Sequence, residues 1–266
     1  MKVVIFCGGF GVRMGEETQR VPKPLIPVGS RPILWHIMKW YASWGYDDFI
    51  LCLGYKGESV KEYFLGYNEA LSNDFVLSNG GRDVELLGSD ISGWRITFVD
   101  TGIQSTIAER LLAVAPHLDG DYFLATYGDG LTDAPLADMV ERLRSSGKTG
   151  LFLSVHPVFN AHVVEADADG TVRSVQDLQH ADVRINGGFF VFRRDLLDHV
   201  NPGEELVDEP FARLIERGEL IAYRHDGFFR AMDTLRDKQL LEDMVQRGEM
   251  PWQPKLSALA AVEAAE

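Results

Sequence analysis

The amino-acid sequence predicts an α/β protein with a Rossmann-like, mixed and mostly parallel sheet, helices on both faces, and a small antiparallel addition in the second half. In the first 156 residues, short apolar runs alternate with segments whose apolar residues recur at helical spacing. The apolar runs are continuous, as in strands that are buried on both faces. After residue 156 the runs become shorter and alternate between apolar and polar residues, which is typical of antiparallel strands.

The first half supplies the strands and helices of the expected parallel sheet. It begins with the apolar run Val3–Cys7, and Ile33–Trp44 follows with Leu34, Ile37, Met38 and Tyr41 at helical spacing. The other expected strands are 49–53, 94–99, 122–127 and 149–156, and the other expected helices are 59–67, 107–115 and 135–145. Because helices separate successive strands, the strands can run parallel with the helices crossing over the sheet.

The second half predicts antiparallel strands at 162–165, 171–175 and 188–192, and helices at 209–217 and 234–246. No linker, internal repeat or block of like charge divides the chain. We therefore expect one domain over residues 2–252, with a first part at about 2–156, a second part at about 157–252, and a tail at 253–266.

The composition restricts the class of protein. The 266 residues are 45% hydrophobic and 25% charged, which is ordinary for a soluble globular protein. A formal net charge of -14 argues against a partner that is a nucleic acid or an anionic membrane, because such proteins usually carry a basic face. A polyphosphate ligand would need local Arg and Lys side chains, and a metal ion, to overcome this acidic background.

The cysteines and the apolar runs indicate a cytoplasmic protein. Cys7 and Cys52 are the two cysteines, and both lie in apolar runs, which predicts buried thiols in a reducing compartment. No apolar stretch approaches the length of a transmembrane helix, and the N-terminal residues show no signal-peptide pattern.

The stretch "CGGFGVRMGEETQRVPKPL" predicts a phosphate-binding loop. Three glycines follow the first strand, so that backbone N–H groups can approach a phosphate closely. The loop is not G-x-G-x-x-G, because Met14 stands at the last glycine position. Pro22 and Pro24 restrict the backbone around Lys23, as expected if its ammonium must reach one fixed place. The alternative for this loop alone is a tight turn with a surface arginine, Arg13.

Two aspartates suggest a Mg²⁺ site. Asp129 lies in "TYGDG" at the carboxyl end of an expected strand, which is the edge where open α/β sheets bind ligands. Asp233 lies in "AMDTLRD", directly before an expected helix. Alone, Asp129 is consistent with a turn residue and Asp233 with a helix N-cap. Together with a phosphate loop and two cations they predict Mg²⁺, which binds few carboxylates plus phosphate oxygens and water.

These motifs resemble those of the sugar-1-phosphate nucleotidylyltransferases. "GGFGVR" with "PKPLIPVG" and "TYGDG" carry the general resemblance. "PILWHIMKWY", "INGGFF" and "GFFRAMDTLRDKQLLE" are similar to the branch of glucose-1-phosphate cytidylyltransferases. The resemblance extends from residue 2 to about residue 252.

The resemblance implies that a phosphate oxygen of a sugar-1-phosphate attacks the α-phosphorus of CTP, and that pyrophosphate leaves. It implies a nucleotide-binding first part, a sugar-binding second part, Mg²⁺ as cofactor and a homo-oligomer. The residues it assigns are Arg13 and Lys23 for catalysis; Gly8, Gly9, Gly11, Val12, Arg110 and Gly128 for the nucleotide; Tyr127, Asp177, Asn186 and Gly187 for the sugar phosphate; and Asp129 and Asp233 for the metal.

The sequence departs from the family pattern at three expected substrate contacts. Val12 replaces a threonine, Ala108-Glu109 replace two glycines, and Leu178 stands where a lysine would meet the sugar phosphate. Arg173 and Arg184 are candidates to supply the lost charge. Two alternatives therefore stay open: an enzyme that uses another nucleotide or acceptor, and a relative without activity that serves as a binding or regulatory subunit.

Overall fold

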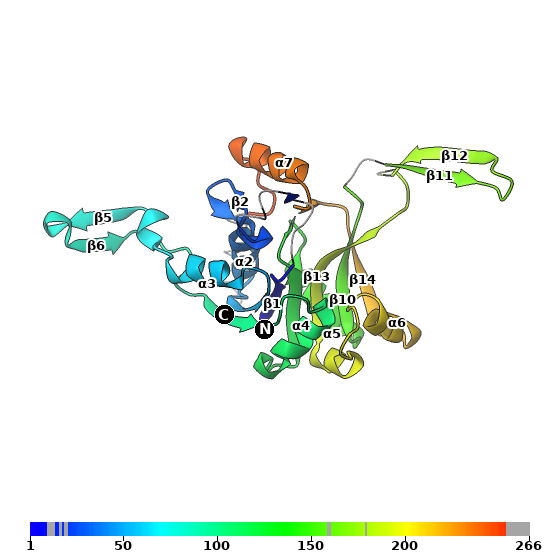
Figure 1. Ribbon diagram of the computed structural model, residues 1–266, viewed down its shortest axis with the longest axis horizontal. Helices are drawn as coiled ribbons and strands as arrows, with labels where there is room; N and C mark the ends of the chain where they lie inside the picture. Colours follow the sequence, from blue (N-terminus) through cyan, green and yellow to red (C-terminus); the bar gives the residue numbers. More distant parts are fainter. Residues whose placement is uncertain (10–13, 16–17, 19–20, 159–160, 179, 254–266) are drawn as a thin grey trace.

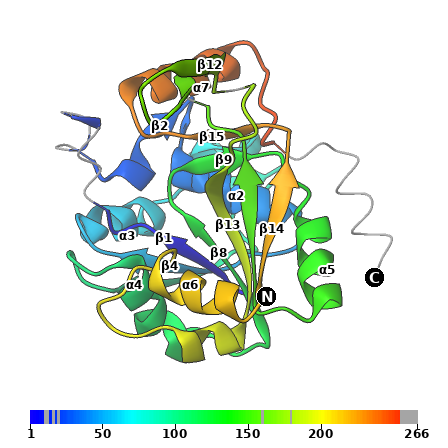
Figure 2. The same cartoon turned by 90° about the vertical axis from the view of Figure 1, so that its right-hand side faces the viewer.

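In the computed structural model, which describes residues 1–9, 14–15, 18, 21–158, 161–178 and 180–253, seven of the described strands form one central sheet (Figure 2). In spatial order the strands are β14 (Leu220–His225), β10 (Gly150–Val155), β13 (Ile185–Arg193), β8 (Tyr122–Tyr127), β1 (Val3–Phe6), β4 (Asp48–Leu53) and β7 (Arg95–Asp100). Neighbouring strands from β8 to β7 run parallel, as do β10 and β14, whereas β13 runs antiparallel to β8 and β10. The predicted mixed, mostly parallel sheet is confirmed.

Helices cover both faces of this sheet, as predicted. The α-helices of the described residues are α2 (Ile33–Ser43), α3 (Gly57–Leu65), α4 (Ile107–Val114), α5 (Leu136–Ser146), α6 (Glu209–Glu216) and α7 (Leu235–Gln246). None of these is long and apolar enough to cross a membrane.

Alternate residues of strand β1 enter two separate hydrophobic cores. Val3 and Ile5 pack in the core that contains side chains of α2 and α5. Val4 and Phe6 pack in the core that contains side chains of α4 and α6. All four are buried, which is why this strand reads as a continuous apolar run and not as an alternating pattern. Cys7 and Cys52 are also buried, and burial raises the pKa of both thiols.

Two β-hairpins project from opposite ends of the molecule (Figure 1). One consists of β11 (His162–Ala166) and β12 (Val172–Asp177), where the sequence predicts two antiparallel strands. The other consists of β5 (Phe75–Ser78) and β6 (Asp83–Leu86), which the sequence analysis did not predict.

The rest of the second half differs in part from the expected addition. The predicted strand 188–192 belongs to β13 and lies inside the central sheet, next to β8. Strand β14, which extends the sheet beside β10, was not predicted. Shorter paired strands are β2 (Pro27–Val28) with β3 (Arg31–Pro32), and β9 (Gly130–Thr132) with β15 (Phe229–Ala231). The predicted tail lies outside the described residues from residue 254 onward.

Candidate active site

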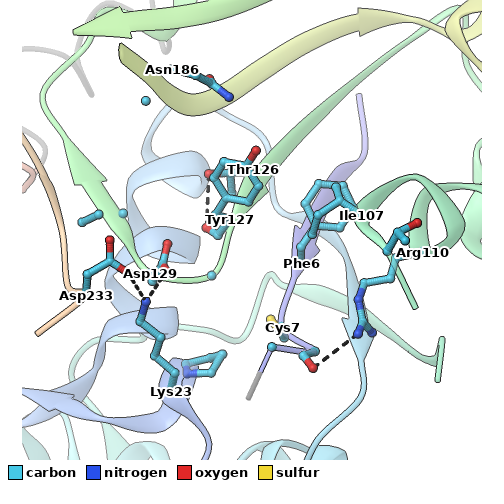
Figure 3. Close-up of a pocket in the computed structure, with 18 of the residues that line it drawn as sticks. Phe6, Cys7, Lys23, Ile107, Arg110, Thr126, Tyr127, Asp129, Asn186 and Asp233 are labelled. Carbon is cyan, nitrogen blue, oxygen red and sulfur yellow. Dashed lines mark hydrogen bonds and ion pairs between the residues drawn. The ribbon is translucent and has the colours of Figure 1, made fainter. Parts of the chain in front are cut away.

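A pocket of about 420 Å³ opens at the carboxyl ends of β1 and β8. Residues from both halves of the chain line it (Figure 3). They include Phe6 at the end of β1, Gly8 and Gly9 after it, Lys23, the start of α4, Tyr127–Gly130, Asn186 and Gly187 of β13, Glu205, and Phe229 to Asp233 in part. The parallel strands thus place the pocket at the edge where the sequence predicts ligand binding.

Lys23 joins the two predicted metal ligands at one side of this pocket. Its Nζ lies 2.6 Å from Asp129 Oδ2 and 2.7 Å from Asp233 Oδ1, and it donates a hydrogen bond to each (Figure 3). The three side chains are partly exposed, at 14%, 25% and 39% respectively, so that a ligand can reach them. The three side chains therefore meet at one point, although Asp129 and Asp233 follow Lys23 by 106 and 210 residues in the sequence.

A short antiparallel ladder brings the two aspartates together. Gly130 of β9 pairs with Ala231 of β15, and the Asp129 carbonyl accepts a hydrogen bond from the Met232 N–H at 2.9 Å. Asp129 thus precedes one strand of the ladder while Asp233 follows the other. The sequence contains both aspartates but gives no signal for this pairing, because each strand has only three residues.

The prolines beside Lys23 fix its position. Lys23–Leu25 forms a 3₁₀ turn in which the Leu25 N–H donates to the Pro22 carbonyl at 2.8 Å. Pro24 is buried against Gly128, where a Cβ would lie 3.3 Å from Pro24 Cγ and 3.0 Å from the Phe6 carbonyl oxygen. Glycine at 128 therefore allows the lysine turn and the β8 loop to approach closely.

The protonation of Lys23 depends on the two carboxylates. Burial lowers the pKa of Lys23, but the charges and hydrogen bonds of Asp129 and Asp233 outweigh that effect and raise the pKa above its usual value. Lys23 is therefore a cation at neutral pH, in a position to neutralise phosphate charge.

Arg110 supports the backbone at Gly8, one of the glycines that line the pocket. Its buried guanidinium donates to the carbonyls of Gly8 and Leu53, at 3.3 and 3.2 Å, and to Thr101 Oγ1 at 2.7 Å. A Cβ on Gly8 would lie 2.0 Å from Arg110 Nη1, so only glycine fits above this guanidinium. Burial lowers the pKa of Arg110. The resemblance assigns Arg110 to the nucleotide, and in the structure its guanidinium holds the backbone that lines the pocket.

Gly11, Val12 and Arg13 lie outside the described residues, so their assigned roles stay predictions.

A strained turn of β13 shapes the side of the pocket that carries Asn186. Gly188 and Phe189 have positive φ angles of +72° and +48°, where the pairing register with β10 also shifts. The Asn186 Oδ1 accepts a hydrogen bond from the Gly188 N–H at 2.9 Å. A Cβ on Gly188 would lie 2.7 Å from a ring carbon of Tyr127. The turn therefore places Asn186, Gly187 and Tyr127 side by side, as three of the four residues predicted for the sugar phosphate.

Asp177, the fourth of these, lies at the base of the β11–β12 hairpin and is not among the residues that line the pocket. Its neighbour Leu178 is buried, at 7% exposure. Arg173 pairs with Asp167 on the hairpin, and Arg184 binds the carbonyls of Ser154 and His225 and pairs with Asp226. Neither arginine lines the pocket, so neither supplies there the positive charge of the lysine that Leu178 replaces.

Glu109 is directed away from the pocket. It forms a capping box at the start of α4, where its Oε2 accepts from the Thr106 N–H at 2.9 Å. Its Oε1 accepts from the Gly203 N–H at 3.2 Å, which ties the loop before α6 to α4. The carboxylate that replaces one of the two family glycines therefore forms hydrogen bonds within the protein.

The described residues contain no group of three or more His, Cys, Asp or Glu side chains arranged to hold a metal. Asp129 and Asp233 nevertheless provide two carboxylates of the kind that Mg²⁺ binds, because both converge on one cation, the Lys23 ammonium. Phosphate oxygens and water would complete such a coordination shell.

Several pocket residues were missed by the sequence analysis. Ser105, Thr106 and Ile107 line the pocket from the start of α4, and Glu205 lines it from the loop before α6. The pattern Thr106-x-x-Glu109 is a capping-box signal and locates the helix start. Nothing in the sequence marks Glu205 as a pocket residue.

Comparison with known proteins defines the class to which this fold and site belong. The nucleotidyl transferase family model matches residues 2–220, and the chain belongs to this family.

Among individual relatives, the chain is 40% identical over 255 residues to the glucose-1-phosphate cytidylyltransferases of Salmonella typhi and Salmonella typhimurium. Each match covers 95% of this chain and 98% of the relative. The fold is similar to the crystal structure of HddC from Yersinia pseudotuberculosis, with a TM-score of 0.66, 16% identity, and coverage of 92% of this chain and 99% of that one.

Proposed function

We propose that this protein transfers a cytidylyl group from CTP to a sugar-1-phosphate, glucose-1-phosphate or a relative, and releases pyrophosphate. The observation that carries the proposal is the convergence of Asp129 and Asp233 on Lys23, inside a pocket that Gly8 and Gly9 also line. The 40% identity to glucose-1-phosphate cytidylyltransferases over 95% of the chain supports the choice of nucleotide and acceptor.

The reaction needs positioning and charge neutralisation rather than a general base. A sugar-1-phosphate is already anionic at pH 7, so its oxygen can attack the α-phosphorus without losing a proton first. A new P–O bond forms, and the bond from the α-phosphorus to the bridging oxygen breaks, with pyrophosphate taking the electron pair. Lys23 neutralises phosphate charge, and the backbone at Gly8 and Gly9 approaches the nucleotide.

We further propose that Asp129 and Asp233 hold Mg²⁺, which would neutralise charge on the reacting phosphates. The two carboxylates have the hard oxygen donors that Mg²⁺ prefers, and they are partly exposed to the pocket.

The test is pyrophosphate release with Mg²⁺, measured for CTP, UTP, ATP, GTP and dTTP against several sugar-1-phosphates. We expect CTP to give the highest kcat/KM, and we expect Asp129→Ala to abolish Mg²⁺-dependent release. Asp119→Ala, at an exposed aspartate outside the pocket, is the matched control. Unchanged turnover in Asp129→Ala contradicts the metal assignment. Absence of turnover with every pair, while nucleotides still bind, favours a relative without activity.

The acceptor remains to be chosen by the substrate matrix. Leu178 is buried, and Asp177, Arg173 and Arg184 are absent from the lining of the pocket, so among the described residues the β11–β12 hairpin and its base supply no cation to it. Such a cation would contact the phosphate that every sugar-1-phosphate carries, so its loss does not distinguish glucose-1-phosphate from a relative, and the matrix of substrates tests the choice directly.

We also propose that the protein is cytoplasmic and forms a homo-oligomer through the β5–β6 hairpin. Cross-strand pairs place Phe75 opposite Leu86 and Leu77 opposite Val84, so these four share one face. They are exposed by 40% to 59%, which is unusual for a face of four apolar side chains in a monomer. A second copy of the chain would bury this face.

A further inference from the structure

Glu205 places a carboxylate in the pocket that the mechanism above does not use. It lies in the loop between β13 and α6, lines the pocket, and is exposed. Its Oε2 accepts a long hydrogen bond of 3.4 Å from the Ile107 N–H, at the first residue of α4. Because this contact is long and open to solvent, the carboxylate keeps acceptor capacity for a ligand.

The loop that carries Glu205 is held from two sides. The Gly203 N–H donates to Glu109 of α4 at 3.2 Å, and the Glu205 N–H donates to Glu209 of α6 at 3.1 Å. The adjacent Glu204 pairs with Arg213 and does not line the pocket. The backbone of Glu205 is therefore fixed before any ligand binds, which lowers the entropy lost on recognition.

The two sides of the pocket differ in their chemistry. Figure 3 shows the cluster of Lys23, Asp129 and Asp233 at one side and Phe6, Ile107 and Arg110 at the other, where the Arg110 guanidinium binds the carbonyls of Gly8 and Leu53. The phosphates of a nucleotide belong at the side of Lys23 and above the glycines. An uncharged base belongs against Phe6 and Ile107, where a flat ring finds apolar side chains. Glu205 contacts Ile107 and so lies at the base side.

The contact between Glu205 and Ile107 changes what the pocket offers to a base. The Ile107 N–H is one of the N-terminal groups of α4 that have no partner within the helix. Left open, it would offer a donor, which suits the carbonyl O4 of uracil. When the Glu205 carboxylate accepts the hydrogen bond of this N–H, the pocket offers acceptor oxygens instead, which suit the amine N4 of cytosine.

We infer that Glu205 selects cytosine over uracil by accepting a hydrogen bond from the exocyclic amine of the base. This inference rests on the proposed function, in which CTP is the nucleotide. It assigns a role in specificity to a residue outside the motifs that mark the family, and it makes Glu109 a positioning residue, because Glu109 holds the loop that carries Glu205.

The test compares kcat/KM for CTP and UTP in the full-length wild type and in Glu205→Gln, with glucose-1-phosphate as acceptor. Glutamine has nearly the same shape but lacks the charge, and its amide can donate to the O4 of uracil. We expect the ratio of CTP to UTP to fall by about tenfold to a hundredfold, the range of one specific contact to a base. Titration calorimetry of each nucleotide without acceptor should show the same shift in affinity.

Asp208→Asn is the matched control. It removes the same negative charge at a position three residues after Glu205, and the Asp208 side chain does not line the pocket. It should keep the wild-type ratio. An unchanged ratio in Glu205→Gln, or a changed preference between sugars with the base ratio constant, overturns the inference while the proposed function stands. A wild type that prefers UTP in both assays contradicts both.

Discussion

Lys23 is the residue on which the charge balance of the pocket depends. Without its ammonium, Asp129 and Asp233 would repel each other and would repel the phosphates of a substrate. The proline-braced turn explains why a lysine with four rotatable bonds can stay at one position, and the raised pKa keeps it charged.

Replacement of Lys23 by methionine should therefore remove most of the activity. We expect kcat/KM to fall by at least about a hundredfold, the usual effect of losing one group that stabilises charge in a transition state. The unfolding midpoint should change little, because both partner carboxylates are partly exposed. Steady-state kinetics and thermal unfolding measure the two effects, with Lys148→Met outside the pocket as control. Activity within threefold of wild type would show that another group neutralises the phosphates.

The raised pKa of the partly buried Tyr127 predicts a loss of stability at alkaline pH. Burial raises the pKa of Tyr127 to about 12, from an ordinary value near 10. Between these values the folded state keeps a proton that the unfolded state has lost, so the free energy of unfolding decreases as pH rises from about 10. The raised pKa of Lys23 acts in the same direction. Urea unfolding at pH 9 and 11 should show the decrease, and Tyr127→Phe should reduce it. An identical pH dependence in the variant would contradict the assignment.

At the scale of elements, the turn Asn186–Phe189 in β13 determines the shape of the side of the pocket that carries Asn186. Its left-handed glycine and phenylalanine cost conformational energy, and the buried contacts of Phe189 with Trp40 and Tyr41 hold them in place. Strain of this kind persists only where the surrounding packing enforces it.

Gly188→Ala should disturb this turn more than its backbone angle alone explains. The added Cβ would meet the Tyr127 ring at 2.7 Å, so we expect a loss of about 2–4 kcal/mol of stability together with a higher KM for the acceptor. Gly147→Ala is the control, because its φ of +67° is similar and nothing lies within 4 Å of its added Cβ. Equal destabilisation of the two variants in urea would refute the steric explanation.

The sequence predicts a strand buried on both faces most closely, whereas of the two exposed hairpins it predicts β11–β12 and misses β5–β6. The strand at 122–127 is predicted with its exact bounds because both of its faces are apolar. The four residues of β5 and the four of β6 are all exposed, so no core imposes a pattern on them. The dipeptide Asn79-Gly80 between them is nevertheless typical of the turn of a β-hairpin.

The site was predictable to the extent that single residues carry its chemistry. Lys23, Asp129 and Asp233 were expected from their motifs, and they meet in space. The contacts of Glu109 with Gly203 and of Glu205 with Ile107 were not predictable, because they join α4 to a loop 94 and 98 residues away in sequence, which local patterns do not encode. Asp177 was expected from its family motif, but the hairpin base that carries it lies outside the pocket.

At the scale of the whole molecule, the apolar face of the β5–β6 hairpin predicts self-association. Leu77→Ser with Val84→Ser should lower the mass measured by light scattering, because it removes a cross-strand apolar pair from the proposed interface. The control is Val164→Ser with Val175→Ser, an equally exposed cross-strand pair on the other hairpin. If the control alone dissociates the protein, or if wild type is monomeric, the proposed interface is wrong.

The central position of β1 has a consequence for synthesis of the chain. Val3 pairs with Phe49 on one side but with Leu124 on the other, so the middle of the sheet joins segments about 120 residues apart. At a ribosomal rate of about 5–20 residues per second, the delay between synthesis of β1 and synthesis of β8 is roughly 6–24 seconds. During that time one edge of an apolar strand has no native neighbour. Chaperones that bind nascent chains would therefore be expected to engage the first 120 residues, and slow codons before β8 would lengthen that exposure.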